Sequence, residues 1–156
     1  MTNVFLFGTL CWPPLLKRVA GQTCPKVEPA VLDGFSVTCA KGHSFPAIHE
    51  GVNEEAKGLL LRDCDEHVLL HLDHYESGFG YQLHPIKLQS ADGLISAKVY
   101  LPPKGIEPGG PWILKNWERE YGQLALEAAL EVMAAQGEMS AAEMMQRYPM
   151  MLVRAN

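Results

Sequence analysis

The hydrophobic residues in the first two-thirds of the chain fall into short runs separated by polar turns, a pattern typical of β-strands. Residues 4–7 (VFLF) are continuously apolar, which predicts a strand buried on both faces. Further strands are predicted at residues 30–40, 45–48, 56–61, 81–89 and 94–101. The sequence SADG, ending at Gly93, indicates a hairpin turn between the last two. Polar residues 22–30 and 50–55 are expected to form a connection and a turn.

Helical signals occur at two places within this strand-rich part. Residues 15–20 follow two prolines and precede Gly21, as in a short helix with proline in its first turn. A second helix is predicted at residues 66–75, with Asp63 or Asp65 as its N-cap.

The C-terminal part has the pattern of a long helix with one buried face. Its apolar residues recur at helical spacing: Ile113, Trp117, Tyr121, Leu124, Ala128 and Val132. We expect this helix to end at Gly137. Residues 140–143 (SAAE) have the form of a capping box and predict another short helix, which ends before Pro149.

The order of these elements predicts the α+β class, with strands first and helices at the end. A chain of 156 residues fits one domain. Residues 102–111 (PPKGIEPGGP) separate an α+β core at residues 1–104 from a helical extension at residues 105–156. We expect the extension to pack on the core within the same domain.

Charge and hydropathy narrow the classes of function. The net charge of −5, without any basic run, argues against a nucleic-acid partner. The apolar runs are too short to cross a membrane, and the N-terminus has no leader pattern. These features predict a cytoplasmic protein.

The four cysteines form no C-x-x-C pair and are expected to be free thiols: Cys11, Cys24, Cys39 and Cys64. Cys39 with His43, or Cys64 with His67, is an alternative as a nucleophile and its base. Buried structural cysteine is the preferred interpretation.

The strongest candidate for chemistry is Glu76, in the sequence LDHYESGFGY. This carboxylate lies where a predicted helix ends, with aromatic residues on both sides. A carboxyl group held against apolar groups has a raised pKa and is suited to general acid or base catalysis. The alternative is a solvated glutamate in a turn.

Two further groups of residues are candidates for binding a substrate. Phe7, Gly8, Thr9 and Leu10 form a predicted strand-to-helix turn whose amides can bind a carboxylate or phosphate, although an ordinary tight turn has the same pattern. The hydroxyls of two tyrosines are candidate ligand contacts, at Tyr81 and Tyr121.

Histidines spaced i, i+4 and i+7 could bind zinc, at positions His67, His71 and His74. The H-E-x-x-H glutamate is absent, so we expect no metal.

Four motifs, in order, resemble the γ-glutamylcyclotransferase-like family in its small AIG2-like branch. They are residues 4–10 (VFLFGTL), 45–48 (FPAI), 58–61 (GLLL) and 72–76 (LDHYE), the last with Tyr81 following. The resemblance spans about residues 3–101. The helical tail is similar to the linker of proteins in which such a domain precedes a Nudix hydrolase, although the chain contains no Nudix box.

This resemblance implies a small mixed β-barrel with flanking helices, and an enzyme that needs no cofactor. In the family, the α-amine of a γ-glutamyl group attacks its own γ-carbonyl, giving 5-oxoproline and a released amine. Glu76 would be the acid/base residue, and the backbone at residues 8–10 would hold the substrate. Phe7 stands where the family usually has tyrosine, and Ser77-Gly78 follows the glutamate where the family usually has glycine directly.

The substrate, and with it the leaving amine, is left open. Glutathione, γ-glutamyl amino acids and γ-glutamyl-lysine isopeptides are the alternatives. A non-catalytic binding module of the same fold is the alternative function. A homodimer through the C-terminal helices is a further expectation.

Overall fold

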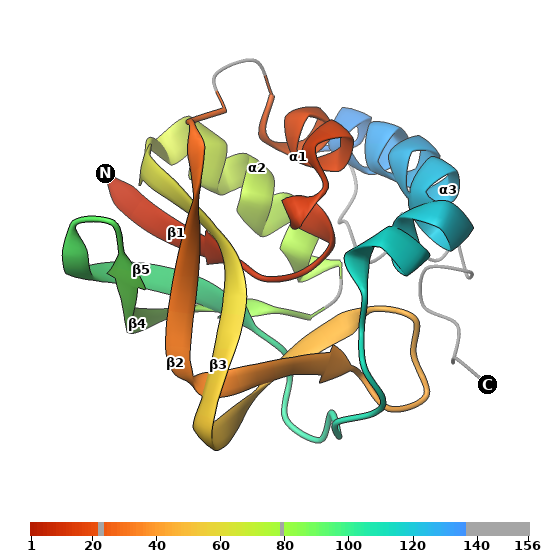
Figure 1. Cartoon of the computed structure of the whole chain (residues 1–156). Helices are drawn as coiled ribbons and strands as arrows, with labels where there is room; N and C mark the ends of the chain where they lie inside the picture. The colour runs from red at the N-terminus through yellow and green to blue at the C-terminus, as the bar shows by residue number, and fades with distance from the viewer. Residues whose placement is uncertain (22–23, 79, 137–156) are drawn as a thin grey trace.

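The computed structural model describes residues 1–21, 24–78 and 80–136 (Figure 1). Its elements, in chain order, are β1 (Thr2–Leu6), the 3-10 turn η1 (Thr9–Cys11), α1 (Pro13–Ala20), β2 (Val27–Cys39), β3 (Pro46–Cys64), α2 (Glu66–Ser77), β4 (Gln82–Ser90), β5 (Gly93–Leu101) and α3 (Leu114–Ala134).

The five strands close into a barrel in the order β1-β3-β2-β4-β5. Strand β1 runs antiparallel to β3 and parallel to β5, and the remaining pairs are antiparallel. The three α-helices gather on one side of this barrel (Figure 1). The predicted mixed β-barrel with flanking helices is therefore confirmed.

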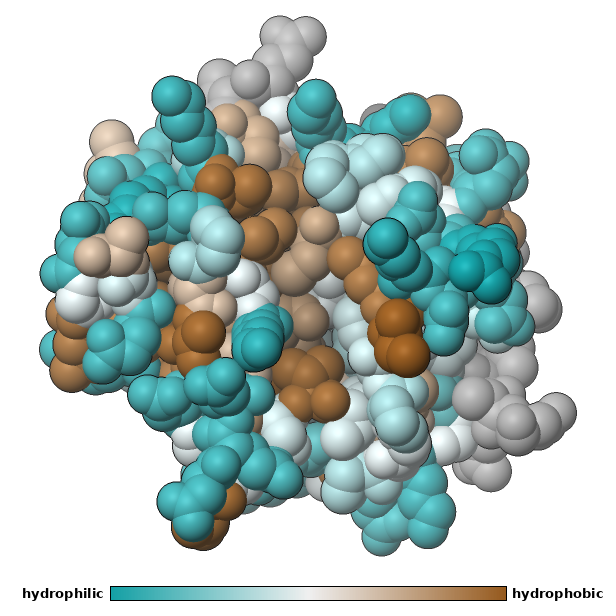
Figure 2. Space-filling view, in the orientation of Figure 1, coloured by the Kyte–Doolittle hydropathy of each residue, from teal (hydrophilic) through white to brown (hydrophobic). Residues whose placement is uncertain are grey.

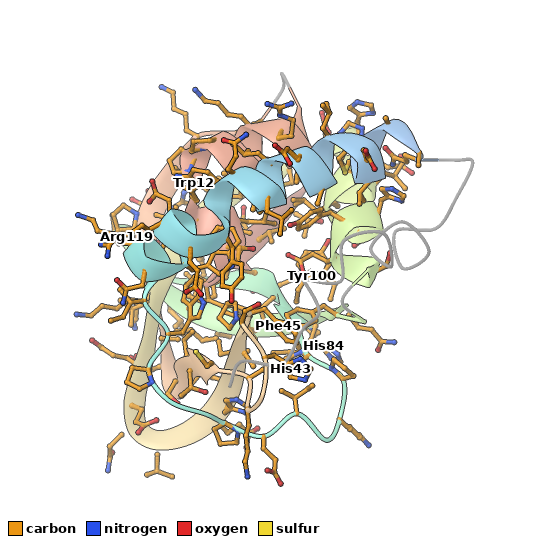
Figure 3. All side chains as sticks on the ribbon, turned by 90° about the vertical axis from the view of Figure 1, so that its right-hand side faces the viewer. Trp12, His43, Phe45, His84, Tyr100 and Arg119 are labelled. Atoms are coloured by element: carbon orange, nitrogen blue, oxygen red, sulfur yellow. The ribbon has the colours of Figure 1, made fainter. Side chains whose placement is uncertain are left out.

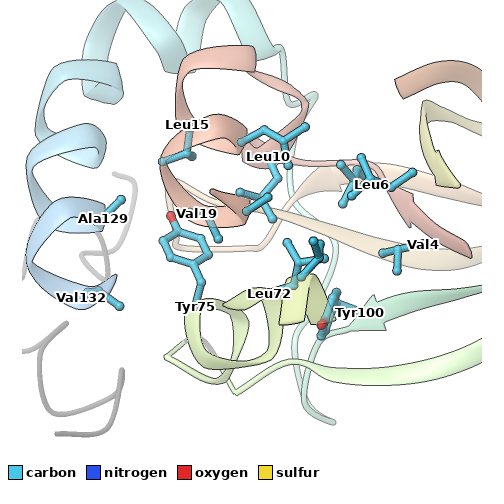
Figure 4. Packing of buried hydrophobic residues seen from close by; sticks show 14 of the residues in the cluster. Val4, Leu6, Leu10, Leu15, Val19, Leu72, Tyr75, Tyr100, Ala129 and Val132 are labelled. Atoms are coloured by element: carbon cyan, nitrogen blue, oxygen red, sulfur yellow. The ribbon is translucent and has the colours of Figure 1, made fainter. Parts of the chain in front are cut away.

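Strand β1 is buried on both faces, as its continuous apolar run predicted. Phe5 and Phe7 belong to the cluster formed by residues of the barrel strands. Val4 and Leu6, which alternate with them, belong to a second cluster shared with the helices (Figure 4). Alternation of side chains along a strand thus connects the barrel to the helical layer.

Two of the strand predictions were wrong in their bounds. The expected connection at residues 22–30 includes the start of β2, because Val27 already pairs with Leu61. The expected turn at residues 50–55 lies within one long strand, β3, which joins the two strands that were predicted separately. There the pairing with β2 jumps in register, and Asn53 has a φ of 61°. Polar residues mark an irregularity in this strand rather than its end.

The helix and hairpin around the candidate glutamate agree with the prediction. Asp65, and not Asp63, caps α2, since its carboxylate accepts a hydrogen bond of 2.9 Å from the amide of Val68. The helix ends at Ser77, slightly beyond the predicted end. Strands β4 and β5 form the predicted hairpin, and Gly93 in its turn has a φ of 98°.

Helix α3 buries part of the face that its spacing predicted, whereas Tyr121 and Leu124 are only partly buried. Trp117, Ala128 and Val132 are buried, and they join the cluster that connects α3 to the other helices. Ile113 is 53% exposed because it precedes the first turn of the helix. The expected helix end at Gly137 and the expected helix from residue 140 lie outside the described residues.

The loop between β5 and α3 is held against the end of β2. Its residue Gly109 donates a backbone hydrogen bond of 2.7 Å to Cys39, and Pro108 forms a bridge with Ala40.

Figure 2 shows hydrophobic residues in brown along the middle of one face, with hydrophilic regions on both sides. Within the described part of the chain, no helix is both long and apolar enough to cross a membrane. All four cysteines are free thiols, as predicted, but only Cys64 is buried, and the expectation of burial was wrong for the other three.

Candidate active site

One cavity lies where the end of β1, the η1 turn, the start of β3 and the last turn of α2 meet. Its volume is about 40 Å³. The residues that line it are Phe5, Leu6, Phe7, Gly8, Thr9, Leu10, Ser44, Phe45, Pro46, Glu76, Tyr81, Tyr100 and Trp117. Residues far apart in the sequence therefore meet around a single carboxylate, Glu76.

The wall formed by the η1 turn depends on a glycine. A Cβ atom on Gly8 would lie 2.8 Å from Cγ of Pro46, closer than real contacts allow. The turn itself is closed by backbone hydrogen bonds of 3.0 Å from Cys11 to Gly8 and from Trp12 to Thr9. Glycine thus lets the first turn after β1 pack directly against the start of β3.

The same turn presents backbone donors at the cavity. The amides of Thr9 and Leu10 open the 3-10 turn, so they have no partner within it. Neither amide donates a hydrogen bond to another group in the described part of the chain. Both residues line the cavity. Unpaired amides at the start of such a turn are donors that can bind a carboxylate or carbonyl oxygen.

Glu76 is placed by α2, in whose last turn it lies. Its side chain is only partly exposed, and burial raises the pKa of its carboxyl group to about 8. The charge of Asp73, one turn earlier, raises this pKa further. A carboxyl group with a pKa near neutrality can both accept and donate a proton at working pH.

Two tyrosines frame the carboxylate through bonds to other elements. The Tyr81 hydroxyl donates a hydrogen bond of 2.7 Å to the carbonyl oxygen of Pro46, which ties β4 to the start of β3. The Tyr100 hydroxyl donates one of 2.5 Å to Asp73, which ties β5 to α2. Burial and the nearby carboxylates raise the pKa of both hydroxyls, so they remain neutral donors.

A third tyrosine, Tyr75, precedes Glu76 on α2 and packs in the core. Tyr75 is fully buried, and its pKa is raised by burial and then by the charge of Glu76. The side chain of Thr9 acts in the opposite direction through a hydrogen bond. Helix α2 is thereby anchored in the core at the residue next to the candidate catalytic group (Figure 4).

Most of the residues singled out in the sequence are brought together here. Phe7, Gly8, Thr9, Leu10, Glu76 and Tyr81 all line the cavity. Tyr121 does not, because Trp117, one turn earlier on α3, faces the cavity in its place. Sequence reasoning missed Tyr100, Phe45 and Trp117 as part of the site. For Trp117 the signal was its position on the predicted buried face of the helix.

Two of the three histidines of α2 contact backbone carbonyl groups, and the ring of the third, His67, lies 4.4 Å from that of His71. A ring nitrogen of His74 lies 2.7 Å from the carbonyl oxygen of Val132, and one of His71 lies 3.4 Å from that of Ala20. In the residues that the structure describes, no three His, Cys, Asp or Glu side chains form a group that could hold a metal ion.

The alternative cysteine nucleophiles are poorly suited to the task. Burial raises the pKa of the Cys64 thiol to about 12 and also raises that of Cys39. The thiolate is the nucleophile, so a raised pKa makes such a thiol less reactive.

Comparison with known proteins identifies a family whose model matches this chain. A family model described as gamma-glutamyl cyclotransferase, AIG2-like, matches residues 4–119, which extends into α3 and beyond the motifs noted in the sequence. A search of curated proteins finds no match to the chain.

Solved structures share the fold at low sequence identity. A solution structure from Arabidopsis thaliana is 23% identical, with a TM-score of 0.62, covering 88% of this chain and 93% of that one. A structure named gamma-glutamyl cyclotransferase is 17% identical, with a TM-score of 0.55 and coverage of 94% and 96%. A yeast gamma-glutamyl cyclotransferase specific to glutathione is 15% identical, with a TM-score of 0.50 and the same coverage.

The family model spans well over half of the chain, and the barrel agrees with these structures. The chain belongs to the gamma-glutamyl cyclotransferase, AIG2-like family.

Proposed function

We propose that this protein converts a γ-glutamyl amine into 5-oxoproline and a free amine, with Glu76 as the general acid/base. The observation that carries the proposal is the position of Glu76 in a small cavity beside the amides of Thr9 and Leu10. The raised pKa of its carboxyl group fits a residue that must both accept and donate a proton.

The charged groups of a γ-glutamyl substrate have partners in this cavity. The amides of Thr9 and Leu10 would bind the α-carboxylate, because they are donors without partners of their own in the described chain. The α-ammonium would lie beside Glu76, the one acidic side chain among the described residues that line the cavity. The paired ammonium favours the ionised carboxylate, so the pKa of Glu76 falls when substrate binds.

The reaction moves two protons from the α-nitrogen to the leaving nitrogen, and both can pass through one group. Glu76 takes a first proton from the α-ammonium, and the free amine nitrogen attacks the γ-carbonyl carbon to form the ring. Glu76 gives this proton to the leaving nitrogen as its bond to that carbon breaks, and it then takes the second proton that the ring nitrogen loses to become the lactam N–H. The released amine takes up this second proton and leaves as an ammonium ion. Ring closure takes place within one molecule, so fixing the glutamyl group in a reactive conformation supplies much of the acceleration.

The test is release of 5-oxoproline from a panel of γ-glutamyl amines by the wild type and by Glu76→Gln. Glutamine keeps the shape of the side chain but cannot move a proton, so we expect a loss of about 10²–10⁴-fold in kcat. Glu127→Gln, which changes an exposed carboxylate on α3, should keep wild-type activity.

Two results would contradict the proposal in different ways. Activity that survives in Glu76→Gln would remove the glutamate from the catalytic role. A folded wild type that is silent across the panel would favour the binding module of the same fold.

A further inference from the structure

A second hollow lies where β1 ends and leaves β3, and we call it the edge groove. Its volume is about 550 Å³, and it shares only Phe7 with the cavity around Glu76. Its other walls are mainly apolar and come from β2, the η1 turn and the start of α3, through Val37, Cys11, Trp112 and Leu114. Figure 2 shows hydrophobic residues in brown between the β2–β3 ribbon and the chain that enters α3, where this groove lies.

The floor of the edge groove is an open edge of β3. Five consecutive residues of this strand, from Glu55 to Leu59, line the groove. Successive side chains of a strand point to opposite faces, so five in a row line one groove only along the backbone edge. The neighbour of β3 on this side is β1, which pairs with it only from Leu59 onward. In the described chain, residues 55–58 therefore have no strand partner at this edge.

The strand edge continues into an acidic hollow that shares Glu55 with the edge groove. Asp33, Glu54 and Glu55 line this hollow, and all three are exposed. None of the three carboxylates forms an ion pair with a described residue. Lys57 is the one basic residue among the described residues that line the two hollows. Arg119 of α3 lines neither and points outward at the edge of the molecule (Figure 3).

We propose that the edge groove binds an extended segment of a partner protein, added as a strand to β3, in which large apolar side chains are flanked by lysine or arginine. An unpaired strand edge supplies backbone hydrogen bonds to such a segment, and the hollows beside it select its side chains. The apolar side chains would contact Trp112 and Leu114, and the basic ones would meet the three carboxylates.

A second copy of this chain fits the groove less well than a single extended segment. In a symmetric pair of copies, the same carboxylates would face one another across the two-fold axis and repel. In each copy, β1 also occupies the edge of β3 from Leu59 onward, which leaves few residues free to pair. The groove is separate from the Glu76 cavity, so the proposal does not depend on the cyclotransferase function.

The probe is the peptide Lys-Thr-Ile-Thr-Ile-Thr-Lys, acetylated and amidated at its ends. It reads the same in both directions, so the polarity of strand pairing does not affect the test. Binding to the full chain is measured by NMR titration of isotope-labelled protein. We expect a Kd below about 1 mM at low salt, as for a weak and transient interface, and weaker binding as salt is added.

Two control peptides separate charge from apolar contact. Glu-Thr-Ile-Thr-Ile-Thr-Glu reverses the charges, and Lys-Thr-Ser-Thr-Ser-Thr-Lys lacks the apolar side chains. Each should bind at least about 10-fold more weakly than the probe.

Methylation of alternate amides in the peptide tests whether it binds as a strand. Only every second residue of an added strand directs its amide toward β3. Methylation of the isoleucine amides and methylation of the threonine amides should therefore have unequal effects, with one pattern abolishing binding. Hydrogen exchange of the protein should slow at residues 55–58 when the probe binds.

Variants of the chain locate the site. Glu54→Lys combined with Glu55→Lys should weaken binding by at least about 10-fold, and Lys57→Glu should strengthen it. All three positions are exposed, so these variants are expected to fold. Leu114→Ser should weaken binding, whereas Leu94→Ser, at a position 64% exposed in β5 and outside the groove, should not.

Three results would overturn the proposal. The first is absence of binding by the probe, or equal binding by the peptide with glutamate ends. The second is an equal effect of the two methylation patterns. The third is self-association of the chain without peptide that Leu114→Ser abolishes, because a second copy would then occupy the groove. Release of 5-oxoproline is measured independently of all three.

Discussion

Replacing Glu76 with glutamine should make the protein more stable at neutral pH, and by an amount that depends on pH. The carboxyl group has a pKa of about 8 in the folded protein and about 4.5 in an unfolded chain. Below pH 4.5 both states hold the proton and burial of the group carries no ionic cost. Between these two values the unfolded chain releases the proton while the folded one keeps it, so the free energy of unfolding falls as pH rises.

The expected size follows from these two values. In this window, each rise of one pH unit lowers the free energy of unfolding of the wild type by up to about 1.4 kcal/mol. From pH 5 to pH 7 the decrease sums to about 2.5 kcal/mol. The side chain is partly exposed, so solvent screening reduces this to about 1–2 kcal/mol. Above pH 8 both states ionise and the loss levels off.

The measurement is urea unfolding of wild type and Glu76→Gln at intervals from pH 4.5 to pH 9. The other residues are the same in both proteins, so their contributions to the pH dependence cancel in the difference. The Tyr75, Tyr81 and Tyr100 hydroxyls stay neutral in this range because their pKa values are raised. Glu127→Gln is the matched control on an exposed position.

We expect the variant and the wild type to converge near pH 4.5 and to diverge by about 1–2 kcal/mol by pH 7. Stability curves that remain parallel across the whole pH range would contradict a raised pKa for Glu76. They would mean that the carboxyl group is solvated in the folded state and has an ordinary pKa.

Three further changes test other parts of the structure. Asp73→Asn removes a negative charge that raises the pKa of Glu76, so the pH profile of 5-oxoproline release should move to lower pH, and less so in high salt. Gly58→Ala places a Cβ atom against a backbone carbonyl oxygen of β1, so urea unfolding should show a loss of about 3 kcal/mol or more. Leu72→Ala empties a fully buried position and should cost about 2–5 kcal/mol by the same measurement, whereas Leu70→Ala, at a position 54% exposed, should cost under about 1 kcal/mol.

Local sequence patterns predicted the elements that carry the candidate site. The apolar run at residues 4–7 identified β1 because strands buried on both faces lack alternation. Glu76 stood out because an ionisable group among aromatic residues at a helix end is unusual. The hairpin turn at Gly93 and the cap of α2 also follow from local backbone chemistry.

Contacts between distant segments could not be predicted in the same way. The parallel pairing of β1 with β5 closes the barrel, but no local pattern in either strand encodes it. Trp117 reaches the cavity only because α3 packs back on the other helices, so the choice between it and Tyr121 depends on the rotation of that helix. The polar residues within β3 gave a false turn because a register shift and a turn use the same residue types.

The proposed function requires that the cavity around Glu76 closes a glutamyl group into a ring. The most direct measurement is the stoichiometry of products from γ-glutamyl-phenethylamine, followed over time by mass spectrometry. We expect equal amounts of 5-oxoproline and phenethylamine, formed by the wild type and not by Glu76→Gln. Release of glutamate with the amine would show hydrolysis by water and would contradict it.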